Sequence, residues 1–129
     1  MTLGEIKAQV MFQTNNDAED LPDFEPHLTD YINEGYDILV LNYAKEHVST
    51  VSEKYPPLIA TETEPEPVPN LPEYAHRALA DYATYLVYRN GNAVKQNRGI
   101  PYYQAFNEVL VKLKYESGGG AQRFRNIYP

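Results

Sequence analysis

Apolar residues recur every three or four positions over most of this chain, which predicts helices rather than strands. The first helix is expected to begin after Thr2, because Thr2 and Glu5 have the spacing of a capping box, in which each side chain satisfies a free backbone N–H. The polar run at residues 15–17 is expected to end it. The apolar positions between these limits are Leu3, Ile6 and Val10.

A second helix is predicted from about Pro26, whose missing N–H costs nothing in a first turn, to about residue 47. It is expected to be the longest element. Gly35 lies within it at a cost of roughly 1 kcal/mol relative to alanine, which suggests a close approach by another helix. The predicted apolar face consists of Leu28, Tyr31, Ile32, Gly35, Tyr36, Leu39 and Tyr43.

Residues 49–70 are predicted to form an extended arm, because proline lacks the N–H that helices and central strands need. One short strand or hairpin is expected near residues 58–61. The arm either wraps over the helices, reaches a neighbouring molecule, or is a solvated acidic loop. Its distinctive residues are Pro56, Pro57, Pro65, Pro67 and Pro69, with Glu62, Glu64 and Glu66 between them.

Two more helices are predicted after the arm. The third follows Asn70 and ends at Asn90 and Gly91, with Gly91 as a left-handed terminator. Pro101 is expected to open the fourth. The apolar face of the third helix is Ala75, Ala78, Leu79, Tyr82 and Leu86, and that of the fourth is Tyr103, Phe106, Leu110 and Leu113. The predicted fold class is therefore all-α, a small bundle of about four helices with a long Pro/Glu-rich loop and an extended C-terminal tail.

The C-terminal segment has a different character from the helical part. Three consecutive glycines at residues 118–120 suggest a flexible hinge, which divides the chain into a helical domain, residues 1–117, and a tail, residues 118–129. The tail mixes basic and apolar residues, which suits docking onto a partner, for instance at a sheet edge. A frayed terminus is the alternative. The residues expected to dock are Arg123, Phe124, Arg125, Asn126, Ile127 and Tyr128.

Charge is divided unevenly along the chain, whose net charge is −7. Residues 1–70 carry 14 acidic and 3 basic side chains, whereas residues 71–129 carry 4 acidic and 8 basic ones. The acidic total argues against general nucleic-acid binding, since contacts to phosphates supply most of that affinity. The division suggests that acidic and basic surfaces meet between identical subunits; two solvated faces are the alternative.

Other features of the composition suggest an intracellular protein with no membrane segment. There is no cysteine, the first residues do not resemble a signal peptide, and the longest aliphatic run covers only residues 38–41. The 12 tyrosines suit half-buried positions and interfaces between proteins.

No pattern typical of catalysis, cofactor binding or metal binding is present. His27, His47 and His76 lack the spacing of zinc ligands, and local capping or packing is expected for them. Four acidic residues crowd near the start of the second helix, where capping and interaction with the helix dipole are the expected roles: Asp20, Asp23, Glu25 and Asp30. The chain is therefore predicted to be a non-enzyme without cofactor.

Two segments resemble a known family. PNLPEYAHRALADYATYLVYRNGN, residues 69–92, and PYYQAFNEVLVKLK, residues 101–114, look like the second half of the head–tail connector (adaptor) proteins of tailed bacteriophages. The match is carried by Leu71, Pro72, Glu73, Ala75, Ala78, Leu79, Tyr82, Tyr85, Tyr103, Phe106 and Leu110. The motif is mainly a packing pattern, and the order of predicted elements extends the likeness to the whole chain.

The resemblance implies a virion protein made in the cytoplasm of the host bacterium. Such proteins form a ring, typically of twelve subunits, beneath the portal protein and above a head-closure or tail-side neck protein. Genomic DNA passes through the ring without sequence-specific binding. The tail at residues 121–129 would then engage the portal, and Glu62, Glu64 and Glu66 would face the channel or a neighbouring subunit. The alternatives are another phage neck protein, a small helical adaptor or regulator of the cell, or an enzyme.

Overall fold

The computed structural model describes residues 1–43, 55–60 and 65–116. These residues form four α-helices and two short 3-10 helices, and no strand is found among them. The all-α prediction is thereby confirmed. In chain order the elements are α1 (Leu3–Thr14), η1 (Ala18–Asp20), η2 (Glu25–His27), α2 (Leu28–Tyr43), α4 (Glu73–Arg89) and α5 (Ala93–Glu116).

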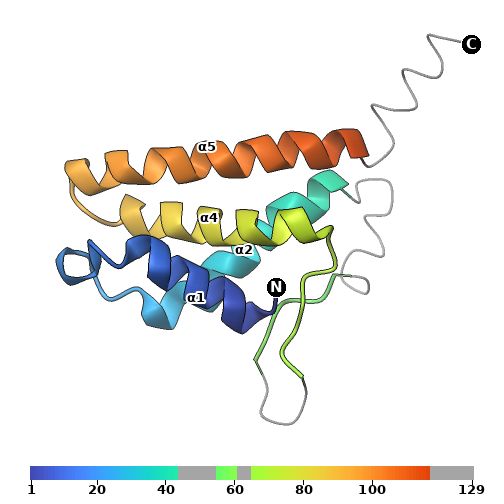
Figure 1. The fold of residues 1–129 in the computed structure, drawn as a ribbon, viewed down its shortest axis with the longest axis horizontal. Helices are drawn as coiled ribbons and strands as arrows, with labels where there is room; N and C mark the ends of the chain where they lie inside the picture. Colours follow the sequence, from blue (N-terminus) through green and yellow to red (C-terminus); the bar gives the residue numbers. More distant parts are fainter. Residues whose placement is uncertain (44–54, 61–64, 117–129) are drawn as a thin grey trace, which may run out of the picture.

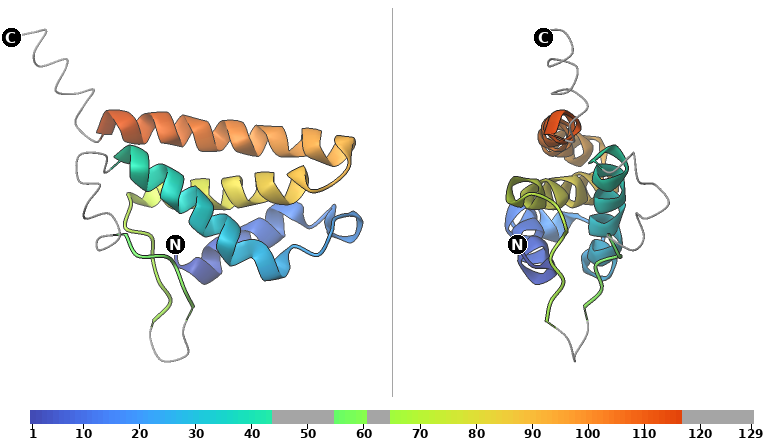
Figure 2. Two further views of the ribbon diagram at one scale, coloured as in Figure 1. Left: turned by 180° about the vertical axis from the view of Figure 1, so that it is seen from behind. Right: turned by 90° about the vertical axis from the view of Figure 1, so that its right-hand side faces the viewer.

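Helix α4 is the centre of the bundle. It contacts α1, α2 and α5, and α5 runs back along it on the side opposite α1 (Figures 1 and 2). Because neighbours surround it, α4 is apolar or small on most of its circumference. Its buried residues are Ala75, His76, Ala78, Leu79, Ala80, Tyr82, Ala83, Thr84, Leu86, Val87 and Tyr88.

The start of α1 follows the predicted capping box. The Glu5 backbone N–H donates to Thr2 Oγ1 at 3.2 Å, and the Thr2 backbone N–H donates to Glu5 Oε1 at 2.9 Å. Gly35 of α2 also has the predicted role, since a Cβ at this position would lie 3.0 Å from Cδ2 of Tyr82 on α4. Pro26 lies in η2, one turn before α2 begins. The predicted end of this helix near residue 47 lies outside the described residues.

Two predictions about helices are wrong. The longest described helix is α5, with 24 residues against 16 in α2. Pro101 does not open α5 but lies inside it. The helix begins two turns earlier because Asn92 caps it: Asn92 Oδ1 accepts the Lys95 backbone N–H at 3.1 Å, and the Asn92 carbonyl accepts the Gln96 N–H at 2.9 Å.

Two local details also differ from the sequence-based expectations. Gly91 does not adopt the left-handed conformation, and its N–H donates to the Tyr88 carbonyl at 3.0 Å in a simple continuation of the turn. In the arm, residues 58–60 form no strand. The side chain of Asn33 on α2 satisfies the backbone of Leu58 instead, accepting its N–H at 2.7 Å and donating to its carbonyl at 2.9 Å.

Candidate interaction surface

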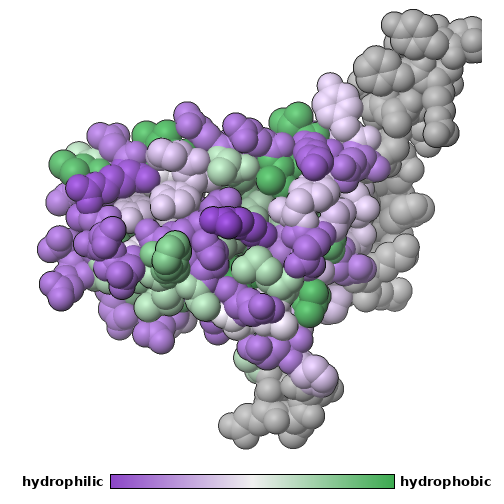
Figure 3. All heavy atoms as spheres, viewed as in Figure 1, coloured by the Kyte–Doolittle hydropathy of each residue, from purple (hydrophilic) through white to green (hydrophobic). Residues whose placement is uncertain are grey.

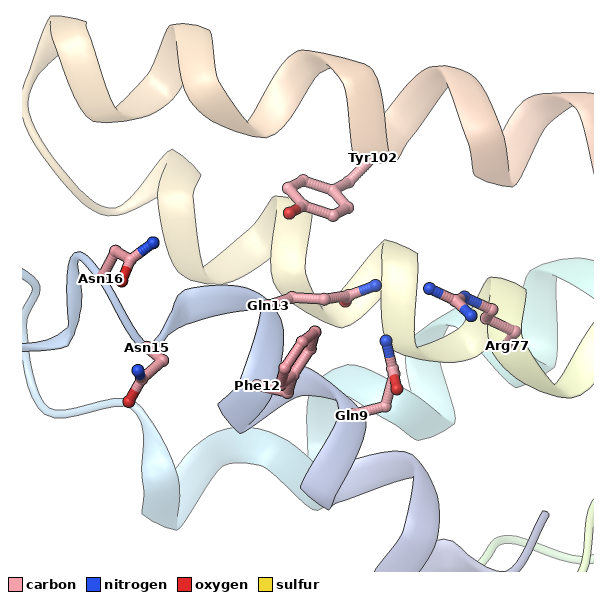
Figure 4. A pocket seen from close by; sticks show the side chains of 7 residues that line it. All are labelled: Gln9, Phe12, Gln13, Asn15, Asn16, Arg77 and Tyr102. Carbon is pink, nitrogen blue, oxygen red and sulfur yellow. The ribbon is translucent and has the colours of Figure 1, made fainter.

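A hollow of about 380 Å³ lies between α1 and α5. Figure 4 shows α1 side chains on one side of it, Tyr102 of α5 on the other, and Arg77 entering from α4. Most of the lining consists of amide and aromatic side chains, and none of these residues is predicted from the sequence to line a site, although Asn15 and Asn16 belong to the polar run expected to end the first helix. The complete lining is Gln9, Phe12, Gln13, Asn15, Asn16, Arg77 and Tyr102.

Phe12 is the most exposed large apolar side chain among the described residues, at 77%. It belongs to α1, yet it lies off the face on which Leu3, Ile6 and Val10 are buried. A phenylalanine in water forgoes about 1.5–3 kcal/mol of burial free energy. Phe12 lines the hollow, so a partner that bound there would gain the free energy of burying this ring.

Gln13 forms a fixed part of the hollow. Its Nε2 donates to Asp81 Oδ1 at 3.0 Å, and its Oε1 accepts from Thr84 Oγ1 at 2.6 Å. Both partners belong to α4, so this amide joins α1 to the centre of the bundle. Burial raises the pKa of Asp81 above its usual value. The amide of Gln13 is thus a polar part of the lining that is already engaged in hydrogen bonds at both its nitrogen and its oxygen.

The wall formed by Tyr102 is held by a buried ionic cluster. The Tyr102 ring stacks on Tyr88 with 6.1 Å between centroids and 12° between planes. Tyr88 in turn donates from its hydroxyl to Asp17 Oδ2 at 2.7 Å. Asp17 also accepts from Lys95 Nζ at 2.5 Å and from Arg98. Tyr102 therefore has a position determined by contacts that reach from α5 through α4 to the connector after α1.

Two charged residues of this cluster, Asp17 and Lys95, are buried as a pair, whereas Arg98 reaches them from a half-exposed position. Asp17 is 7% exposed and Lys95 is 8% exposed. The hydrogen bonds from Lys95 and Tyr88, with the nearby charge of Arg98, hold the pKa of Asp17 below its usual value. Burial, with the hydrogen bond to Asp17, raises the pKa of Tyr88. Asp17 is accordingly ionised at neutral pH. Removing either partner of a buried pair of this kind destabilises the fold, because the other charge is left buried without a counter-charge.

Arg77 is the only charged residue lining the hollow. It is exposed, and it forms no ion pair within 4 Å among the residues that the structure describes. Asp81, one turn along the same helix, feels the charge of Arg77, which acts to lower the pKa of that carboxyl, but the Asp81 carboxylate accepts its hydrogen bond from Gln13. The exposed guanidinium can therefore still take a closer anionic partner.

The base of the acidic arm is attached to the bundle next to α1. The Leu3 N–H donates to the Pro67 carbonyl at 2.9 Å, and Thr2 Oγ1 donates to Glu66 Oε2 at 3.2 Å. A hollow of about 490 Å³ lies between the two described segments of the arm, beside Tyr36. Of the three predicted arm glutamates, only Glu66 is described; Glu62, Glu64 and the tail residues 123–128 lie outside the described residues.

The described histidines and the acidic residues near α2 lie in separate surroundings. His76 is buried and its Nε2 lies 2.8 Å from the Leu71 carbonyl, in agreement with the local role predicted for it. His27 stacks on Tyr31, and His47 is not described. No group of three potential metal ligands occurs among the residues that the structure describes. Asp20 alone of the four crowded acids approaches the buried cluster, 3.7 Å from Lys95.

Little in the sequence points to these features. A buried Asp in a polar run at a helix end, such as residues 15–17, is indistinguishable by sequence from an exposed one. Phe12 was the one available signal, since an aromatic residue off the apolar face of an amphipathic helix requires an explanation.

Comparison with known proteins adds no identification: neither protein-family models, nor curated proteins, nor solved structures gave a match to this chain. Among the described residues, no helix combines the length and the apolar character that crossing a membrane requires.

Proposed function

We propose that this chain is a structural subunit of the neck of a tailed bacteriophage, a head–tail connector assembled as a ring beneath the portal. The proposal starts from the resemblance carried by residues 69–92 and 101–114. In the structure these two segments form most of α4 and α5, the pair of helices on which the rest of the bundle is arranged. An all-helical bundle also favours a connector over the β-rich head-closure and tail-terminator proteins.

The observation that supports assembly best is the spread of exposed apolar side chains over several elements. Figure 3 shows hydrophobic patches along α5 and over α1, separated by hydrophilic residues. A ring subunit has two different side faces and two ends, so a spread of apolar side chains over several elements suits it. The residues concerned are Met11, Phe12, Leu41, Ile59, Val68, Val94, Ile100, Tyr103, Val111 and Tyr115.

The outer face of α5 is the best-defined of these surfaces. Its exposed apolar side chains are Ile100, Tyr103, Val111 and Tyr115, and they alternate with the exposed charged residues Glu108, Lys112 and Lys114. Tyr103 was predicted on the buried face of this helix and is 40% exposed instead. The opposite side of the helix packs on α4 and α2. A face that mixes apolar and charged side chains suits contact with a neighbouring subunit.

The remaining partners follow from the same proposal. The tail, with Phe124, Ile127 and Tyr128 as apolar anchors and Arg123 and Arg125 as cations, engages the portal. A head-closure or tail-side neck protein binds the other end of the ring. Genomic DNA passes through without sequence-specific contacts, in keeping with the acidic net charge. The protein is thus placed at the portal vertex of the virion.

Electron cryo-microscopy of the full chain mixed with a matching portal ring tests the proposal, with light scattering of the chain alone as its companion. We expect a ring beneath the portal, and loss of that ring when residues 118–129 are deleted. Deletion should leave the helical circular dichroism spectrum unchanged, which separates loss of docking from loss of folding. A chain that never binds the portal would instead favour a small cellular adaptor.

A further inference from the structure

We propose that the hollow between α1 and α5 binds the free part of the Pro/Glu-rich arm of a second copy of this chain, residues 59–65, which lie between the ties of that arm to its own bundle at Leu58 and Glu66. The inference rests on the proposed function, since it names a contact by which neighbouring subunits of the ring would join. It also chooses between the two roles left open for the arm glutamates, assigning them to a neighbour and not to the channel.

The sequence of the arm defines what its binding site must offer. The free part, residues 59–65, reads IATETEP, and its threonines and proline favour an extended chain. An extended peptide has no internal hydrogen bonds, so its carbonyl groups need external donors, and the Ile59 and Pro65 side chains need apolar surfaces. The segment also needs cations, because residues 55–72 contain Glu62, Glu64 and Glu66 and no basic residue.

The hollow offers all three. Phe12 and Tyr102 present aromatic rings from opposite sides, as Figure 4 shows. The side-chain amides of Gln9, Asn15 and Asn16 form no hydrogen bond with any residue that the structure describes, so their N–H groups are available to carbonyl oxygens.

The charges of the two surfaces are complementary. Arg77 is the only charged residue of the lining and has no ion-pair partner within 4 Å among the described residues. The one carboxylate beside it, Asp81, is bonded to Gln13. A glutamate of the arm would complete the pair, and Lys or Arg side chains in its place would be repelled.

The arm of the same molecule is not the occupant. Its two ends are tied to the bundle, at Leu58 by the side chain of Asn33 and at Pro67 by the backbone of Leu3. From these ties it leaves the bundle on the side of α1 that lies away from α5 (Figure 1). The hollow opens between α1 and α5, so the occupant must come from another copy.

The hollow is preformed, which favours a weak but specific contact. Tyr102 is fixed through Tyr88 and the Asp17 cluster, and Gln13 is fixed by Asp81 and Thr84, so binding requires little ordering beyond that of the peptide. One such contact is small, but a ring repeats it at every interface, and repetition raises the overall affinity.

The test is the binding of a fluorescently labelled synthetic peptide, residues 59–70, to the full-length protein, measured by anisotropy. We expect saturable binding with a dissociation constant on the order of 100 µM, as suits a small contact. Phe12→Ala and Arg77→Glu should each weaken it by about tenfold or more. Val111→Ala, which removes an exposed apolar side chain nine residues beyond Tyr102 toward the C-terminal end of α5, should leave it unchanged.

A charge reversal makes the test specific. A peptide with lysine in place of Glu62, Glu64 and Glu66 should bind Arg77→Glu better than it binds the unaltered protein. Phe12 and Arg77 are exposed, so thermal unfolding of their variants should match that of the parent. Absence of saturable binding up to about 1 mM peptide, or equal binding by the Phe12→Ala protein, would overturn the inference.

Failure of the inference and failure of the proposed function are distinguishable. A ring that forms beneath the portal while the peptide does not bind removes only the assignment of the arm. Peptide binding that depends on Phe12 and Arg77, in a chain that ignores the portal, keeps the contact between copies and removes the connector.

Discussion

At the scale of single residues, Tyr88 has the most connected position in the described structure. Its hydroxyl donates to Asp17, its ring supports Tyr102, and its Cβ lies against Gly99 of α5. The first contact belongs to the ionic cluster, the second to the wall of the hollow, and the third to the packing of α4 on α5. The Tyr88 side chain thereby connects the buried Asp17 with Tyr102 on the wall of the exposed hollow.

The ionic cluster leads to a prediction about pH. Asp17→Asn should lower the thermal unfolding midpoint at pH 7, because Lys95 is left buried without its anion. Since the pKa of Asp17 is lowered in the folded state, its stabilising effect is complete above the unfolded value, near 4, and disappears as pH falls through the folded value. The difference between variant and parent, followed by circular dichroism melts, should therefore shrink below about pH 4.

The matched control for this prediction is Asp20→Asn. Asp20 lies 3.7 Å from Lys95 but is largely exposed, so its removal should change the midpoint little. If the unfolding midpoint of Asp17→Asn stayed below that of the parent by the same amount from neutral to acid pH, the loss would come from altered packing or hydrogen bonding and not from the lost charge.

At the scale of helices, close contact between α4 and α5 depends on Gly99. A Cβ at this position would lie 2.9 Å from Cβ of Tyr88 and 3.4 Å from the Tyr85 carbonyl oxygen, neither of which can move without the helix. We expect Gly99→Ala to destabilise the protein by about 1–3 kcal/mol in urea unfolding, in spite of the better helix propensity of alanine. At Gly4 the obstacle is only the flexible end of Glu66, so Gly4→Ala should be tolerated.

A second prediction at this scale concerns Pro101. It lies inside α5, where proline removes one backbone hydrogen bond and costs up to about 3 kcal/mol. Pro101→Ala should therefore raise the free energy of unfolding by about 1–3 kcal/mol. Pro26→Ala is the control, since Pro26 lies in the short η2 turn, where its N–H is not missed. No gain from Pro101→Ala would mean that a bend at this position is needed for packing on α4.

How far the sequence predicted the fold depended on whether a signal was local. The capping box at Thr2, the stripe of α2 and the buried face of α4 follow from spacing alone, and the structure confirms them. The start of α5 could not be predicted from spacing, because Pro101 is typical of a first helical turn but lies inside the helix, whereas the true cap, Asn92, is a weak signal in the sequence. The strand expected in the arm failed because the side chain of Asn33, 25 residues away, satisfies the backbone there.

The candidate surface was less predictable than the fold. Its residues come from α1, α4 and α5 and meet only in three dimensions. The sequence near Asp17 predicts only a helix end, because Lys95 and Arg98, which bond its carboxylate, are distant in the sequence. The predicted tail and two of the arm glutamates lie outside the described residues, so those assignments remain predictions.

At the scale of the whole molecule, the division of charge along the chain also holds for the residues that the structure describes. Residues 1–43 carry nine acidic side chains and a single lysine, Lys7, whereas residues 73–116 carry four acidic and six basic ones. Association between copies that places unlike regions together should weaken with salt. Sedimentation of the full chain at about 0.05 M and about 0.5 M salt should show larger species only at the lower value. Association that is unchanged or stronger in high salt would point to apolar contacts alone.

The two aromatic sides of the hollow differ in how freely they can change over generations. Tyr102 stacks on Tyr88, which bonds to the ionic cluster that stabilises the fold, whereas Phe12 and Arg77 are exposed and make no such contact with the interior. Substitutions of Phe12 and Arg77 that suit an altered neighbour should therefore change the stability of the fold little, so they need no prior stabilising substitution. We expect relatives of this chain to diverge at these two positions together with their own arm sequence, while Tyr88, Asp17 and Lys95 persist as a set.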